Sequence, residues 1–184
     1  MRRSLVLLGS LLVLGLVGCG SEAREPLPKA RAAEPQAAKL NWRETYPKRG
    51  RHLTFGVDRF EVTAEGWSAA VSIRNGTQIP FELGKRPLQL AFGLMLFEDG
   101  NLETLDEEAR NGRLPPLREA VEIEPPPPAV LAPAQTWRAT ISAPGSLVDS
   151  AYVRVSFGTL VAEREPPEGF RPSVVWITDK AYKL

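Results

Sequence analysis

An apolar side chain occupies every second position of residues 67–74, Trp67-Ser68-Ala69-Ala70-Val71-Ser72-Ile73-Arg74. Side chains of a β-strand point to opposite faces in turn, so a period of two over this length predicts a half-buried strand. Asn75-Gly76 follows at once, and this dipeptide favours a turn. The stretch therefore predicts an amphipathic strand that ends in a tight turn and has one face in a hydrophobic core.

The same pattern recurs along the rest of the chain. Residues 53–64 alternate with a slip of one position at Asp58-Arg59, which predicts a β-bulge. Pro80 suggests that the short strand at 79–83 lies at a sheet edge, and the apolar run 88–97 suggests a strand buried on both faces. Further strands are expected at 119–124, 136–143, 151–161, 174–177 and 181–184. Seven to nine short strands without βαβ alternation predict an all-β, antiparallel sandwich.

Residues 98–112 interrupt this pattern. Asp99-Gly100 is a strong hairpin signal, so we expect a brief returning strand at 102–105. Residues 106–111, with the sequence DEEARN, predict a single helical turn, and Gly112 stands where a helix would end.

Three segments of the strand region resemble immunoglobulin-like domains of unknown function in exported bacterial lipoproteins. They are VSIRNGTQIPFEL (71–83), LAPAQTWRATISAPGS (131–146) and AYVRVSFG (151–158). Ala134 stands where glycine is usual in such a turn, and the insertion 106–128 is longer than expected. The Cys…Trp…Cys spacing of true immunoglobulin domains is missing, so the resemblance implies an immunoglobulin-like sandwich architecture and no particular activity.

The start of the chain has the layout of a secretory signal. Met1-Arg2-Arg3 is basic, and residues 4–17 are almost wholly apolar. A membrane-spanning helix needs about 20 apolar residues, so this run is short for a span. We expect export of the chain from the cytoplasm.

The end of the apolar run, Leu16-Val17-Gly18-Cys19, resembles the lipobox of bacterial lipoproteins. The resemblance implies that the Cys19 thiolate receives a diacylglyceryl group and that the signal peptide, residues 1–18, is removed. Two or three acyl chains hold a protein firmly at a membrane, whereas one holds it marginally. The expected location is therefore extracytoplasmic, at the cell membrane or the outer membrane. Gly20, where an aspartate would favour inner-membrane retention, is compatible with the outer membrane.

Residues 19–47 are expected to carry the lipid anchor and a flexible tether rich in Ala, Pro and Glu, since such a segment buries little apolar surface. A short helix over 29–39 is an alternative, although Pro35 interrupts it. The aromatic stretch 41–46 marks the first contact with the folded domain, which is expected to span 48–184. Lys48, Arg49, Arg51 and His52 form a basic cluster, either attracted to anionic head groups or simply solvated.

Composition excludes several classes of function. The chain has 23 Lys and Arg against 22 Asp and Glu, and this balance argues against a nucleic-acid binder. With Cys19 acylated, no thiol remains for a disulfide, so the core must stabilise the domain. The single histidine, His52, follows two arginines and is expected to be a surface residue. Without a His or Cys cluster or a nucleophile motif, we expect no enzyme, no cofactor and no zinc site.

Two groups of acidic side chains are candidates for a calcium site or for hydrolysis. Asp99, Asn101 and Glu103 have the spacing of a calcium loop, but Thr104 replaces the glycine that such a loop needs, so an acidic helix start is preferred. Glu122 and Glu124 share one strand face and would be the acids of an unrecognised hydrolase. The run Pro125–Pro128 is expected to be an extended loop.

Trp67, Trp137 and Trp176 lie on predicted strands and decide between two of the functional hypotheses. If they are buried, the favoured function is a non-catalytic, lipid-anchored envelope protein whose sandwich binds a protein partner or has a structural role in shielding an assembly. If they are surface aromatics beside Tyr152 or Tyr182, a small-ligand or glycan-binding module becomes credible. The unrecognised hydrolase is the third hypothesis.

Overall fold

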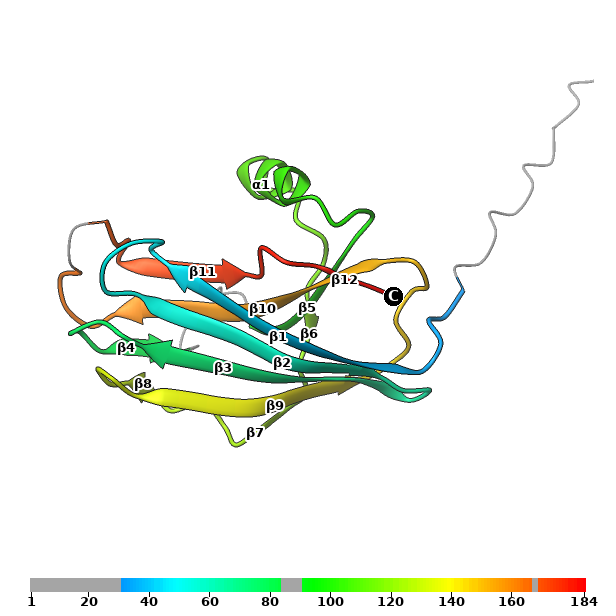
Figure 1. The fold of residues 1–184 in the computed structure, drawn as a ribbon, viewed down its shortest axis with the longest axis horizontal. Coiled ribbons are helices and arrows are strands. Elements are labelled where there is room, and N and C mark those ends of the chain that lie inside the picture. Colours follow the sequence, from blue (N-terminus) through cyan, green and yellow to red (C-terminus); the bar gives the residue numbers. More distant parts are fainter. Residues whose placement is uncertain (1–30, 84–90, 167–168) are drawn as a thin grey trace, which may run out of the picture.

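The computed structural model of the chain describes residues 31–83, 91–166 and 169–184, and shows two antiparallel β-sheets packed face to face (Figure 1). This confirms the predicted all-β sandwich. The lipobox and residues 19–30 of the expected tether lie outside the described residues, as do residues 88–90 of the expected strand 88–97.

The first sheet has five strands in the order β1-β2-β3-β9-β7, all antiparallel. Their bounds are β1 Gln36–Tyr46, β2 Leu53–Val62, β3 Gly66–Asn75, β9 Thr136–Pro144 and β7 Glu122–Glu124. The expected bulge is present, because the β2–β3 register shifts between Val57 and Arg59. Trp67, Ala69, Val71 and Ile73 of β3 all face the core and are buried, as the alternation of 67–74 predicts.

The second sheet is arranged around one long strand, β10. Antiparallel pairing places β5 and β4 along one side of β10 and β12 and β11 along the other, while β6 extends β5 and β8 extends β4. The bounds are β10 Tyr152–Ala162, β5 Phe92–Phe97, β4 Phe81–Leu83, β11 Ser173–Ile177, β12 Tyr182–Lys183, β6 Arg118–Glu119 and β8 Val130–Leu131. The expectation that residues 92–97 are buried on both faces is confirmed: Leu94 faces the core and Met95 the helix side.

Aromatic rings join the two sheets in the core. The Phe55 ring of β2 stacks on Trp176 of β11, with centroids 5.0 Å apart and an angle of 4° between planes. Phe55 also meets Phe157 of β10 edge-on at 5.2 Å, and Trp137 of β9 meets Phe92 of β5 at the same distance. Such pairs add about 0.5–1.5 kcal/mol each to the stabilisation from buried area.

The expected boundary of the domain at residue 48 is wrong. Residues 36–46 form the whole strand β1, paired along β2, and Ala32 bridges Val148 further upstream. The Ala33 N–H also donates to Leu147 O at 2.8 Å. Alternate side chains of β1 are half-buried or buried against the core, so ladder hydrogen bonds and partial burial together order a segment whose composition suggests disorder. A helix over 29–39 is likewise wrong from Gln36 onward.

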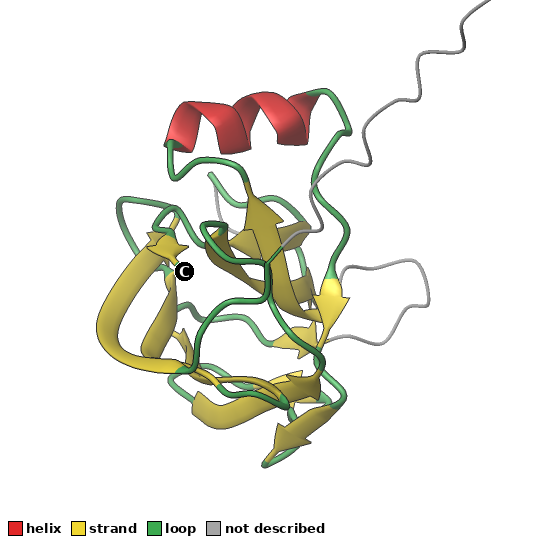
Figure 2. Cartoon of the chain, turned by 90° about the vertical axis from the view of Figure 1, so that its right-hand side faces the viewer, coloured by secondary structure: helices red, strands yellow, loops and turns green. Residues whose placement is uncertain are grey.

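The hairpin expected at Asp99-Gly100 is also wrong, and so is the strand at 102–105. A single helix, α1 (Leu102–Arg110), follows β5 and lies over the outer side of the second sheet (Figures 1 and 2). The Asp99 carboxylate accepts hydrogen bonds from the Asn101 N–H at 2.8 Å and the Thr104 hydroxyl at 3.0 Å, which fixes the helix start. Leu105 is buried against Met95 and Phe97, and this contact secures α1 to β5.

Two other strand predictions need correction. The short strand begins after Pro80 and lies between β10 and β8, so it is not at an edge. The expected strand 119–124 is divided: the Ala120 N–H donates to Phe92 O of the second sheet, whereas the Val121 N–H donates to Ser142 O of the first. The chain therefore crosses between sheets at these residues, and Val121 is left 72% exposed.

Candidate functional site

The three tryptophans proposed as possible surface aromatics are buried. Trp67, Trp137 and Trp176 are 4%, 5% and 9% exposed. Trp137 Nε1 donates to Pro125 O at 3.2 Å, and Trp176 Nε1 donates to Glu44 Oε2 at 3.0 Å. Because each ring packs in the core, none offers a stacking face to a sugar, and the surface-aromatic interpretation is wrong.

The residues proposed for catalysis are not brought together. His52 is half-buried just before β2, and its Nδ1 lies 2.9 Å from Gly50 O. Glu122 and Glu124 are exposed on the outer face of β7, far from His52 along the sheet, and Glu122 Oε2 accepts from the Ser142 hydroxyl at 3.5 Å. The Asp99 carboxylate accepts its hydrogen bonds from residues at the start of α1. Among residues 31–83, 91–166 and 169–184, no three His, Cys, Asp or Glu side chains are grouped as metal ligands.

A buried polar network closes the open side between the sheets. Glu44 of β1 is 6% exposed, and its carboxylate accepts from Trp176 Nε1 and from the backbone N–H groups of Asp179 and Lys180 at 2.9 and 3.0 Å. This side chain therefore satisfies two backbone donors beyond β11 that would otherwise be left unpaired.

Arg154 of β10 completes this network. Its guanidinium is fully buried and donates to the carbonyl oxygens of Thr178, Asp179, Gly100 and Asn101 at 2.5–2.9 Å. Burial lowers the pKa of Arg154, while Glu44 and then Asp179 oppose that shift through their negative charge. The network links β1, β10, the start of α1 and the segment after β11, and its role is structural.

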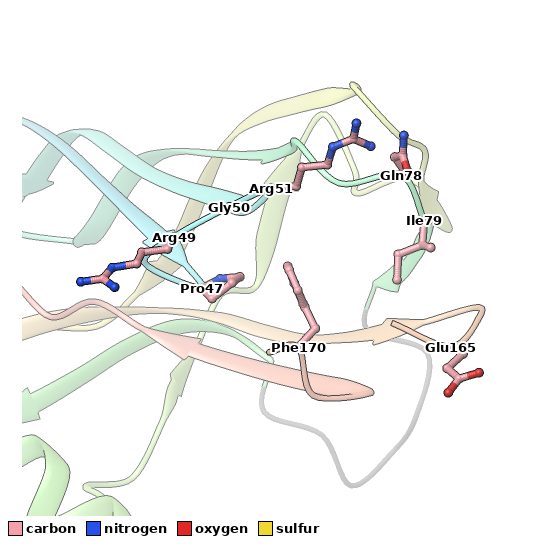
Figure 3. Close-up of a pocket in the computed structure, with 8 residues that line it drawn as sticks. All are labelled: Pro47, Arg49, Gly50, Arg51, Gln78, Ile79, Glu165 and Phe170. Atoms are coloured by element: carbon pink, nitrogen blue, oxygen red, sulfur yellow. The ribbon is translucent and has the colours of Figure 1, made fainter. Parts of the chain in front are cut away.

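The most promising concave surface lies at the end of the sandwich opposite residue 31. There the loops after β1, β3 and β10 surround a pocket of about 370 Å³, drawn in Figure 3. Pro47, Ile79 and Phe170 provide apolar walls. Arg49 and Arg51 are exposed at the pocket, and Glu165 lies on the second-sheet side. We refer to this as the loop-end pocket.

Asn75 fixes one wall of the loop-end pocket. This fully buried side chain donates from Nδ2 to Ile79 O at 2.8 Å and to Leu131 O at 3.0 Å. Its Oδ1 accepts from the Thr77 N–H and hydroxyl. Gly76 donates to His52 O at 3.0 Å, and a Cβ on Gly76 would lie only 2.7 Å from that oxygen. The Asn75-Gly76 turn predicted from sequence therefore also positions Ile79.

The opposite walls are fixed by packing and by an ion pair. The Phe170 ring meets Tyr46 edge-on at 5.4 Å and Phe81 at 6.0 Å. Lys48 Nζ lies 2.7 Å from Asp179 Oδ2, and this hydrogen bond raises the pKa of Lys48. The loop that carries Arg49 and Arg51 is thereby held to the segment after β11.

Figure 3 shows that the two arginines point in different directions, with Arg49 directed away from the apolar walls and Arg51 directed toward Gln78. Arg51 is therefore the guanidinium group placed to bind an anionic group that carries an apolar neighbour. Within the described part of the chain, neither Arg49 nor Arg51 has a carboxylate oxygen within 4.0 Å. The sequence singled out this basic cluster, but it did not reveal Ile79 or Phe170 as neighbours. These two residues lie 28 and 119 positions from Arg51, and only the pairing of the strands brings them together.

In the parts of the chain that the structure describes, no helix has the length and apolar character needed to cross a membrane. Comparison of the chain with protein families, with curated proteins and with solved structures finds no match.

Proposed function

We propose that this chain is a lipid-anchored protein of the cell envelope whose sandwich is a non-catalytic binding module for a protein partner. The loop-end pocket is the observation that supports this function most. It combines the exposed Arg51 with apolar walls from three loops, which suits a partner segment with an acidic residue next to an apolar one.

The course of the chain favours this surface. Residue 31 enters the sandwich at one end, where Ala32 bridges Val148, and β1 then runs the length of the sheet (Figure 1). Eleven strand residues span about 36 Å, so the loop-end pocket lies at the far end of the domain from the chain entry. With an anchor at Cys19, the pocket would be displayed away from the membrane.

The burial of the tryptophans favours a protein partner over a glycan. A sugar-binding face uses exposed aromatic rings, and all three candidate rings are core residues here. A pocket with charged rims and modest apolar walls resembles the polar rim and small apolar centre of a transient protein interface.

Site-specific photo-crosslinking in intact cells tests the proposal. A photoreactive residue replaces Gln78, which is exposed at the pocket, in the full chain at native expression. We expect a discrete crosslinked protein of defined mass from this position. The yield should fall at least about tenfold when Arg49→Glu and Arg51→Glu are added, because the reversed charges repel an anionic partner.

The matched control places the same photoreactive residue at Glu65, an exposed turn residue at the end where the chain enters. We expect no such product there. Equal products from Gln78 and Glu65, or a yield from Gln78 that ignores the charge reversal, would contradict the assignment of the loop-end pocket as the binding surface.

A further inference from the structure

A second cationic surface lies on the outer face of the five-stranded sheet, away from the loop-end pocket. It is a shallow basin of about 450 Å³ lined by Arg43 of β1, Arg74 of β3 and Arg138 of β9. The hydroxyl side chains of Thr54, Ser72 and Thr136 complete its floor. We call this surface the arginine basin.

Strand register explains why these side chains meet. Arg43 pairs with Gly56, Gly56 with Ser72, and Ser72 with Arg138, so the four form one row across β1, β2, β3 and β9. In the next row on the same face, Arg74 lies between Thr54 and Thr136. Arg74 and Arg138 are therefore diagonal neighbours on adjacent strands.

Gly56 makes room for the first arginine. A Cβ built on Gly56 would lie 2.4 Å from Ser72 Oγ, 3.1 Å from Arg43 Nη1 and 3.3 Å from Arg43 Cζ. The Arg43 guanidinium therefore lies across the bare backbone of β2 and approaches Ser72. Without a glycine in the middle of this row, Arg43 could not reach inward over the sheet.

The arginine basin carries an excess of two positive charges. Arg43 forms an ion pair with Asp58, which neutralises it. Arg74 and Arg138 are exposed, and across residues 31–83, 91–166 and 169–184 neither has a carboxylate oxygen within 4.0 Å. Diagonal neighbours on adjacent strands are within reach of long side chains, so a dianion bound between Arg74 and Arg138 could contact both guanidinium groups.

The chemistry of the basin fits a phosphate ester. A phosphomonoester carries a charge of about −1.5 to −2 at pH 7 and three acceptor oxygens. Guanidinium groups donate to such oxygens in a fixed fork, and the surrounding hydroxyls add further donors. Of the acidic side chains on this face, Asp58 is paired with Arg43, and Glu61, Glu122 and Glu124 lie toward the opposite end of the sheet.

We infer that the arginine basin is a binding site for a phosphomonoester group, held by Arg74 and Arg138 with Arg43 lying across Gly56. This site is distinct from the loop-end pocket and does not depend on the proposed protein partner.

Calorimetric titration of the full, detergent-extracted chain tests the site. The probes are glycerol 3-phosphate and monomeric dihexanoyl phosphatidic acid, which share the phosphomonoester and differ in the acyl chains. We expect saturable binding of both. Equal affinities identify a soluble ester as the ligand, and tighter binding of the acylated probe identifies a lipid head group; each result supports the site.

Substitutions in the basin should weaken binding of glycerol 3-phosphate. Arg74→Ala and Arg138→Ala should each raise Kd at least about tenfold. Gly56→Ala should also raise Kd, because its methyl group would displace the Ser72 hydroxyl and crowd the Arg43 guanidinium. Arg59→Ala is the matched control: Arg59 is an exposed arginine on β2 paired with Glu61, and its loss should leave Kd unchanged.

Several results would overturn the inference. They are the absence of saturable binding, equal loss of affinity in Arg59→Ala and Arg74→Ala, and full affinity in the Arg74→Ala/Arg138→Ala double variant. Salt-sensitive dimerisation that is lost in that double variant and is not displaced by glycerol 3-phosphate would also overturn it, since the arginines would then face the acidic end of a second copy. Thermal denaturation of each variant verifies that it is folded.

Discussion

Replacing Glu44 with alanine tests the structural role of β1, the strand that composition assigns to a flexible tether. The carboxylate is 6% exposed and accepts three hydrogen bonds at 2.9–3.0 Å. Alanine would leave Trp176 Nε1 and two backbone N–H groups without acceptors, and it would remove the negative charge that partly offsets the burial of Arg154.

The magnitude follows from these contacts. A hydrogen bond to a charged group contributes about 1.5–3 kcal/mol, and water entering the gap recovers part of the loss. Removing one partner from a buried charged network costs about 3–5 kcal/mol, which we take as the expected loss in the free energy of unfolding. For a domain of this size, that corresponds to a fall in Tm of about 6–20 °C.

Urea denaturation followed by tryptophan fluorescence measures this loss. Glu34→Ala is the matched control, because Glu34 lies in the same expected tether and its side chain is 72% exposed beside Arg31. We expect no measurable change for the control. If Glu44→Ala unfolds at the same urea concentration as the unmodified chain, β1 is not an integral strand and the reasoning fails.

The remaining predictions concern the core, the helix, an ion pair and the anchor. Trp137→Ala should destabilise the domain by about 3–5 kcal/mol in urea denaturation, because a large ring leaves the core; a loss below about 1 kcal/mol would refute its burial. Leu105→Ala should cost about 2–3 kcal/mol and expose α1 to limited proteolysis, whereas Leu102→Ala, at a position 40% exposed, should do neither. At any pH below 10.5, Lys48→Met should unfold at a lower urea concentration than the unmodified chain. The pKa of Lys48 is raised in the folded state, so its stabilising contribution is lost when it deprotonates, and the difference between the two proteins should vanish as pH rises above that pKa. A difference that persists at high pH would contradict this. Cys19→Ser should accumulate as unprocessed precursor in immunoblots of cell fractions, and normal processing would exclude the lipobox.

The sandwich could be predicted because its strands carry their own periodic signal. The alternation in residues 67–74 predicts which side chains face the core, and the slip at Asp58-Arg59 predicts the bulge, and both predictions use only local sequence. The signal fails for β1, whose alternation of half-buried and exposed residues includes alanines and a lysine that resemble a linker. It also fails at Asp99-Gly100, where the Asp99 side chain starts a helix rather than closing a hairpin.

The candidate site was only partly visible in the sequence. Arg49 and Arg51 stand out as a local basic cluster, but their neighbour Phe170 comes from a distant loop. The arginine basin has no local signal at all: Arg43, Arg74 and Arg138 are single residues in three strands, and only the register across Gly56 and Ser72 brings them onto one face.

Intact-mass analysis of the native chain extracted from membranes tests the central proposal, that this sandwich functions on a lipid anchor, most directly. We expect a mature protein that begins at Cys19 and carries the added mass of a diacylglyceryl group, with or without a further acyl chain. A protein that begins at Met1 and carries no acyl mass would contradict the anchor, and with it the display of the loop-end pocket in the cell envelope.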